Sequence, residues 1–96
     1  MLEQVKRALR ITSGVFDEEL KALIEAGLDD LTIAGVDAQE NQDKPLVVRA
    51  VITYCKVHFG EPDQYDRLKA AYDEQKAQLM TAYGYAHGEN TDEAIR

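Results

Sequence analysis

The sequence has few cysteines and no long apolar run, and each shortage excludes a class of protein. Its single cysteine, Cys55, cannot close a disulfide within the chain, which favours a reducing compartment. No run of about 18 apolar residues could span a bilayer. Charges interrupt the opening MLEQVKRALRIT too often for the core of a signal peptide. We therefore expect a soluble chain that is not exported and that has no membrane partner.

Basic residues are also scarce. The chain has 11 Lys and Arg against 18 Asp and Glu, a net charge of −7 and a pI near 4.7. The few basic residues are scattered, whereas a protein that binds duplex DNA needs clustered Lys and Arg to neutralise phosphates. An acidic surface can still lie beside DNA, because repulsion prevents sticking. Sequence-specific nucleic-acid binding is therefore not expected.

The 96 residues, of which 45% are hydrophobic, are enough for one compact domain. Apolar positions from Leu2 to Leu9 predict a short first helix that ends near Arg10. The segment FDEELKALIEAGLDDL predicts a second helix, amphipathic, with Phe16 on its apolar stripe and Asp17 as the candidate N-cap. Gly35 is the expected stop of this helix.

The stretch GVDAQENQDK, residues 35–44, is polar and has no apolar period. Its length of roughly ten residues exceeds the usual helix connection of about 2 to 8. Two interpretations stay open, a solvated linker and a projecting loop that touches a partner. In the second, Asp37 and Glu40 are the candidate contacts.

The segment from Pro45 to Phe59 predicts a central helix with unusually little polar surface. Arg49, Thr53 and Lys56 share one narrow arc, and apolar or aromatic groups occupy nearly all the rest. Such a helix is expected to be packed on two sides by neighbours, or on one side by another subunit. The candidate core or oligomer-interface residues, including two tyrosines of the next helix, are Val47, Val48, Val51, Tyr54, Cys55, His58, Tyr65 and Tyr72.

A last helix is predicted from about Pro62 to Tyr83, after a turn at Gly60 and with Asp63 as its cap. Its tyrosine stripe suits either a core or an interface. Residues 84–96 have no sustained period and are interpreted as an arm that is flexible or becomes ordered on binding. The candidate contacts of this arm are Tyr85, His87 and Ile95.

These elements together predict an all-α fold. It is a small bundle of about four helices, in which a short first helix and two long amphipathic helices surround a central apolar helix. Residues 1–83 form the domain, and residues 84–96 the arm.

Cys55 and His58 are the only residues close in sequence that suggest chemistry. Their spacing suits one metal, but a structural zinc site needs four ligands, and His87 lies in the arm. An apolar helix face raises the pKa of a thiol, so Cys55 is better explained as an inert core residue. His58 is interpreted as buried or as lying at a subunit contact. We expect no catalytic residue, cofactor or metal.

The block AVITYCKVHFGEPDQYDRLKAAYDEQKAQL, residues 50–79, resembles the small head-tail connector proteins of tailed bacteriophages and prophages. The opening helices LEQVKRALRIT and FDEELKALIEAGLDDL precede it in the family's order, so the resemblance covers roughly residues 1 to 83. It implies a structural, non-enzymatic subunit that forms a ring of about twelve copies beneath the portal. Such a ring extends the DNA channel and offers a platform to the next head-completion or tail protein. The implied location is the virion, with assembly in the host cytoplasm.

Two other interpretations stay open from the residues alone. One is a helical interaction or regulatory module whose partner is another protein. The other is a small metal-dependent or cysteine enzyme built on Cys55 and His58, which requires turnover to fail when these residues are changed.

Overall fold

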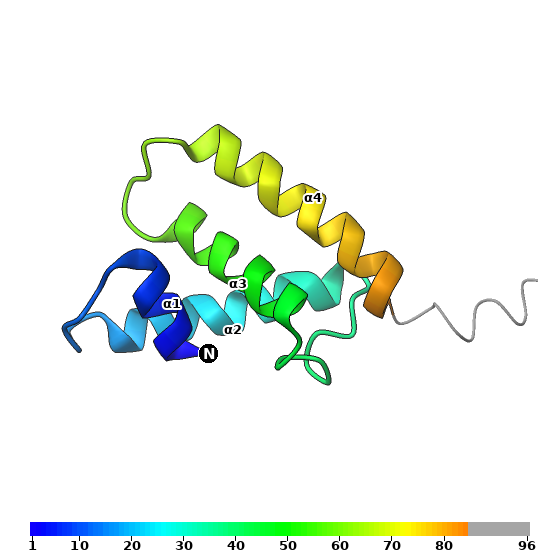
Figure 1. The fold of residues 1–96 in the computed structure, drawn as a ribbon, viewed down its shortest axis with the longest axis horizontal. Helices are drawn as coiled ribbons and strands as arrows, with labels where there is room; N and C mark the ends of the chain where they lie inside the picture. The colour runs from blue at the N-terminus through cyan, green and yellow to red at the C-terminus, as the bar shows by residue number, and fades with distance from the viewer. Residues whose placement is uncertain (85–96) are drawn as a thin grey trace, which may run out of the picture.

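The computed structural model describes residues 1–84, which fold into four α-helices (Figure 1). The helices are α1 (Leu2–Leu9), α2 (Asp17–Ile33), α3 (Pro45–His58) and α4 (Tyr65–Tyr83). Within these residues the only β-type pairing is an isolated antiparallel bridge between Val36 and Gly84. The predicted all-α bundle is confirmed. The predicted arm, apart from Gly84, lies outside the described residues.

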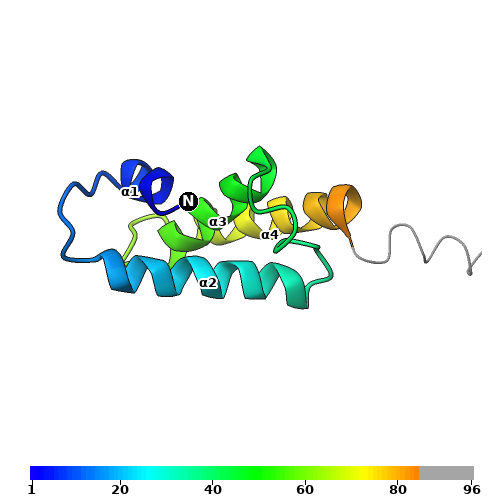
Figure 2. The ribbon, with the colours of Figure 1, turned by 90° about the horizontal axis from the view of Figure 1, so that it is seen from below.

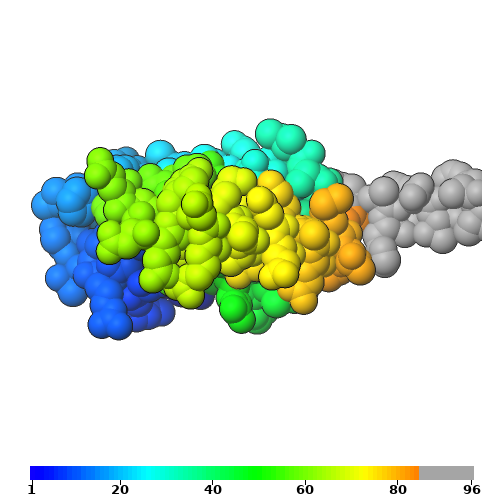
Figure 3. All heavy atoms as spheres, turned by 90° about the horizontal axis from the view of Figure 1, so that it is seen from above, coloured from blue at the N-terminus to red at the C-terminus, as the bar shows by residue number. Residues whose placement is uncertain are grey.

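The helices pack around α3, which runs antiparallel to both α2 and α4 (Figures 1 and 2). It packs against each of the other three helices, most extensively against α4 and α2. In Figure 3, α4 lies along one face of the molecule, and the start of α3, in green, emerges beneath its second half. No helix within residues 1–84 is long and apolar enough to cross a membrane.

The neighbouring helices cover α3, which explains why so much of its surface is apolar. Val47, Ala50, Val51 and Cys55 are fully buried, and they join buried residues of the other helices in one core. The predicted central helix packed on two sides is therefore what the structure shows. Because the chain's own helices cover this surface, its apolar width gives no argument for a second subunit.

The C-termini of α1 and α2 have the same capping motif. After α2, the Val36 N–H donates to the Leu31 carbonyl at 2.9 Å, while Gly35 takes a left-handed conformation with φ of 105°. This is a Schellman motif, and it confirms Gly35 as the predicted stop. After α1, Arg10 takes the equivalent place with φ of 62°, although a side chain makes this conformation unfavourable.

Both predicted N-caps are wrong. Phe16 is the N-cap of α2, and Asp17 instead lies 2.8 Å from the Lys6 Nζ, in a largely buried ion pair that ties α1 to α2. At the same end of the molecule, α4 begins at Tyr65, not at Pro62. Asp63 lies in the turn before it, and no side chain caps the helix.

Candidate interaction surface

The predicted core or interface residues of α3 separate into two groups. Val47, Val51 and Cys55 are fully buried, so within the chain they are core residues. Val48 and Tyr54 are half-buried at the edge of the core. A role for any of these residues at an oligomer interface stays a prediction.

His58 is exposed, so the interpretation of a buried histidine is wrong. Its ring packs on that of Tyr54, one turn earlier on α3, with centroids 4.3 Å apart. Tyr54 in turn lies against Gly27 of α2, where an added Cβ would come within 3.1 Å of the tyrosine ring. The bare backbone at Gly27 therefore lets α2 approach α3 closely.

Cys55 is suited to packing and not to chemistry. Burial raises the pKa of its thiol to about 12, so the reactive thiolate is scarce near neutral pH. His58 points to the surface from the same helix. Residues 1–84 contain no group of three or more His, Cys, Asp or Glu side chains able to hold a metal ion.

Asp30 of α2 connects that helix to α4 through two side chains. The Tyr72 hydroxyl donates to Asp30 Oδ2 at 2.5 Å, and the Lys76 Nζ lies 3.2 Å from the same oxygen. Burial acts to raise the pKa of Asp30, but these hydrogen bonds and the positive charge of Lys76 outweigh it, so the pKa lies below its ordinary value. Burial and the Asp30 hydrogen bond both raise the pKa of Tyr72.

The two tyrosines of α4 named as core or interface candidates therefore differ. Tyr72 is 3% exposed and belongs to the core. Tyr65, the first residue of α4, is 46% exposed and stays available to a partner. The sequence pattern places both on one stripe, but only the packing of α4 separates them.

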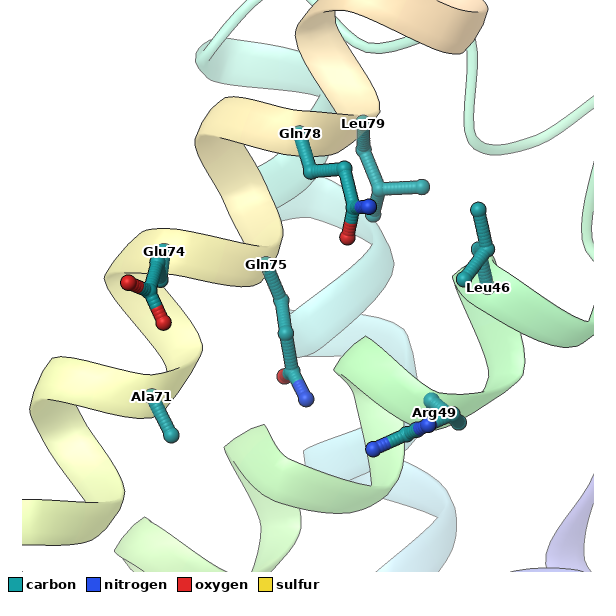
Figure 4. A pocket seen from close by; sticks show the side chains of 7 residues that line it. All are labelled: Leu46, Arg49, Ala71, Glu74, Gln75, Gln78 and Leu79. Carbon is teal, nitrogen blue, oxygen red and sulfur yellow. The ribbon is translucent and has the colours of Figure 1, made fainter.

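A groove of about 390 Å³ separates the first half of α3 from the second half of α4 (Figure 4). Its lining residues are Leu46, Arg49, Ala71, Glu74, Gln75, Gln78 and Leu79. The Gln75 side chain points between the two helices (Figure 4), and its Oε1 atom is buried with no hydrogen-bond partner within residues 1–84. Arg49 makes no ion pair with another described residue.

The groove exists because α4 presents small and polar side chains to this part of α3. Ala71 and Gln75 leave space where larger apolar residues would fill it. An acceptor buried without a partner costs about 1–3 kcal/mol, so Gln75 weakens the packing between α3 and α4. Nothing in the sequence pattern of α4 predicted a groove.

The connection between α2 and α3 is packed against the domain. Neither interpretation of this segment, a solvated linker or a projecting loop, implied such packing. Val36 and Ala38 are fully buried, and the Asp37 N–H donates to the Tyr83 carbonyl at 2.7 Å. Asp37 is therefore partly enclosed, not projecting, and its Oδ1 is buried without a partner in the described part of the chain. Glu40 is exposed and stays a predicted contact.

Several large apolar side chains that were not predicted as partner contacts are exposed. Val15 is 79% exposed and Ile33 is 84% exposed, and they lie at opposite ends of α2. Phe16, expected on the apolar stripe, is also exposed and meets Phe59 edge to face, with ring centroids 5.3 Å apart. The exposure of Val15 could have been predicted from the sequence, because Val15 lies between Ser13-Gly14 and the acidic first turn of α2, outside the helical period.

Comparison with known proteins gives a match to a protein family. A family model described as phage connector protein matches residues 1–86, which include all four helices. No curated protein and no solved structure matches the chain significantly.

Proposed function

This chain belongs to the phage connector protein family, and from that premise we propose that it is a ring-forming subunit between the portal and the tail. The observation that carries the proposal is the family match across residues 1–86, which covers the whole described domain. In this role the ring extends the DNA channel below the portal. It also gives the next head-completion or tail protein a platform.

The exposed apolar side chains support assembly. Val15 and Ile33 project from opposite ends of α2, and Met80 is exposed near the end of α4. Apolar side chains that stay exposed on the domain are available for contacts with partners. Two different contact surfaces on one subunit allow head-to-tail packing, which closes into a ring when the rotation between neighbours is suitable. A ring of about twelve copies is the proposed assembly.

The charge of the chain supports passage of DNA. A net charge of −7 per subunit, repeated around a ring, gives an acidic assembly that repels phosphates. DNA then moves through the channel without sequence-specific binding. The proposed location is the virion, after assembly in the host cytoplasm.

Contacts with the portal and with the next protein of the particle are proposed for exposed parts of the chain. Glu40, on the connection between α2 and α3, is one candidate. Tyr85, His87 and Ile95 are the others, and they lie outside the described residues. The function is structural, and no enzymatic step is assigned to any residue.

Native mass spectrometry of the purified chain, with and without the portal protein, tests this proposal. The expected result is a ring, or a portal complex that carries several copies of the chain. Negative-stain microscopy of the same sample gives the symmetry of the particle. A chain that stays monomeric in both conditions, at high and low concentration, would refute the proposed function.

A further inference from the structure

Val15 and Phe16 form a fixed apolar corner at the start of α2. The Val15 side chain is largely exposed. Its backbone N–H donates a hydrogen bond to the Ser13 Oγ at 3.0 Å, which fixes the residue in place. Phe16 is held by its edge-to-face contact with Phe59. Because the corner is ordered before binding, a partner that covers it loses little conformational entropy.

The residues after the corner carry negative charge and free donors. Glu18 and Glu19 lie exposed in the first turn of α2. No side chain caps this helix, so N–H groups of its first turn are not satisfied by a cap. The start of α2 therefore combines an apolar knob, carboxylates and hydrogen-bond donors.

The groove between α3 and α4 offers the opposite set. Its apolar wall includes Leu46, which is partly exposed, and its volume of about 390 Å³ can receive a side chain of the size of valine or phenylalanine. Arg49 is an unpaired cation among the described residues, and Glu74 is the other charged group of the lining. The apolar corner thus matches the groove in shape, and the carboxylates beside the corner match the Arg49 guanidinium in charge.

We propose that the Val15–Phe16 corner of one copy seats in the α3–α4 groove of the next copy, with Glu19 facing Arg49. The proposal rests on the ring assembly proposed above and specifies its subunit interface. A second copy is the occupant because this one chain carries both complementary surfaces.

The positions of the two surfaces suit a repeating contact. The corner lies where α2 begins, and the groove lies beside the second half of α4, towards the other end of the molecule (Figures 1 and 4). Each copy therefore offers its corner to one neighbour and its groove to another. Such a contact is heterologous, and repetition of it builds a ring.

Cysteine cross-linking between copies tests the interface. Val15→Cys and Ala71→Cys variants of the full chain are mixed under assembly conditions, with the portal present if assembly requires it, and oxidised with copper–phenanthroline. A disulfide forms only when the two Cα atoms approach within about 7 Å. The yield of the cross-linked mixed dimer should therefore exceed the yield from a control pair by roughly tenfold. The control pairs Val15→Cys with Ile33→Cys, which is more exposed than Ala71 but does not line the groove. Cys55 is buried and is common to all variants.

A charge exchange provides the second test. Arg49→Glu should abolish assembly, and adding Glu19→Lys to the same chain should restore it. Two results would overturn the proposed interface but not the proposed ring. One is assembly in which the Val15–Ala71 cross-link does not exceed the control. The other is a groove that cross-links only to the portal. A chain that never assembles would overturn both proposals.

Discussion

Replacing Tyr72 by Phe removes one hydroxyl group and tests whether Asp30 holds α4 to the rest of the domain. The hydroxyl donates to the Asp30 carboxylate at 2.5 Å, and the tyrosine ring is almost completely buried. Hydrogen bonds to charged groups contribute about 1.5–3 kcal/mol, and the lower value applies because the Asp30 side chain is 36% exposed. We therefore expect Tyr72→Phe to lower the free energy of unfolding by about 1.5 kcal/mol at pH 7.

The measurement is urea unfolding followed by circular dichroism, at a protein concentration where the wild-type chain is monomeric. With a typical urea dependence of about 1–3 kcal/mol per molar, the unfolding midpoint should fall by roughly 0.5–1.5 M. The melting temperature should fall by about 6–12 °C for a domain of this size.

The pH dependence follows from the lowered pKa of Asp30. Its stabilising contribution is fully present above the ordinary pKa of 3.8 and is lost as the pH falls through the lower folded-state value. The difference between wild type and Tyr72→Phe should therefore be constant from pH 7 down to about pH 5 and shrink below about pH 4.

Tyr65→Phe is the matched control, because Tyr65 lies on the same helix, is half exposed and makes no side-chain hydrogen bond with a described residue. Its stability should stay within about 0.5 kcal/mol of wild type. An equal loss in both variants, or a Tyr72→Phe difference that does not shrink at pH 3, would refute the role given to Asp30.

Two further substitutions test the core and the end of α1. Val51→Asp places a charge at a fully buried position of α3 and should cost more than about 4 kcal/mol, which leaves a chain with little helical circular dichroism and no assembly. Cys55→Ser, one turn away and equally buried, should cost only about 1–2 kcal/mol, and normal folding of Val51→Asp would contradict the burial assignment. Arg10→Gly relieves a left-handed conformation and should raise the free energy of unfolding by about 0.5–1 kcal/mol. Arg7→Gly, inside the same helix, should lower it by a similar amount, and a loss in both variants would show that the Arg10 conformation is not strained.

Local signals in the sequence account for much of the fold. Helical periods predicted the four helices, and glycine predicted the ends of α2 and α3. Prediction failed at the starts of α2 and α4. At α2 the reason is that an acidic residue near a helix start is both a candidate cap and a candidate ion-pair partner. Asp17 pairs with Lys6, a choice that depends on how α1 folds back onto α2.

The candidate surface was predicted less well, since exposure depends on how helices pack. His58 has the same spacing from Tyr54 that core residues of α3 have from one another, yet it is exposed. Asp37 looked like part of a free loop, but the buried Val36 and Ala38 on either side attach it to the domain. The groove beside Gln75 required two helices to be placed, and no pattern within one helix encodes it.

The sequence by itself determined the helices, the acidic charge and the family, because periodicity, composition and the order of short blocks are properties of the chain. Only the tertiary structure decided which apolar residues remain for a partner. The surface of α3 that looked too wide for one domain is covered by α1, α2 and α4. Val15 and the groove beside Gln75 stay open within residues 1–84, because none of the four helices covers Val15, and α4 does not fill the groove.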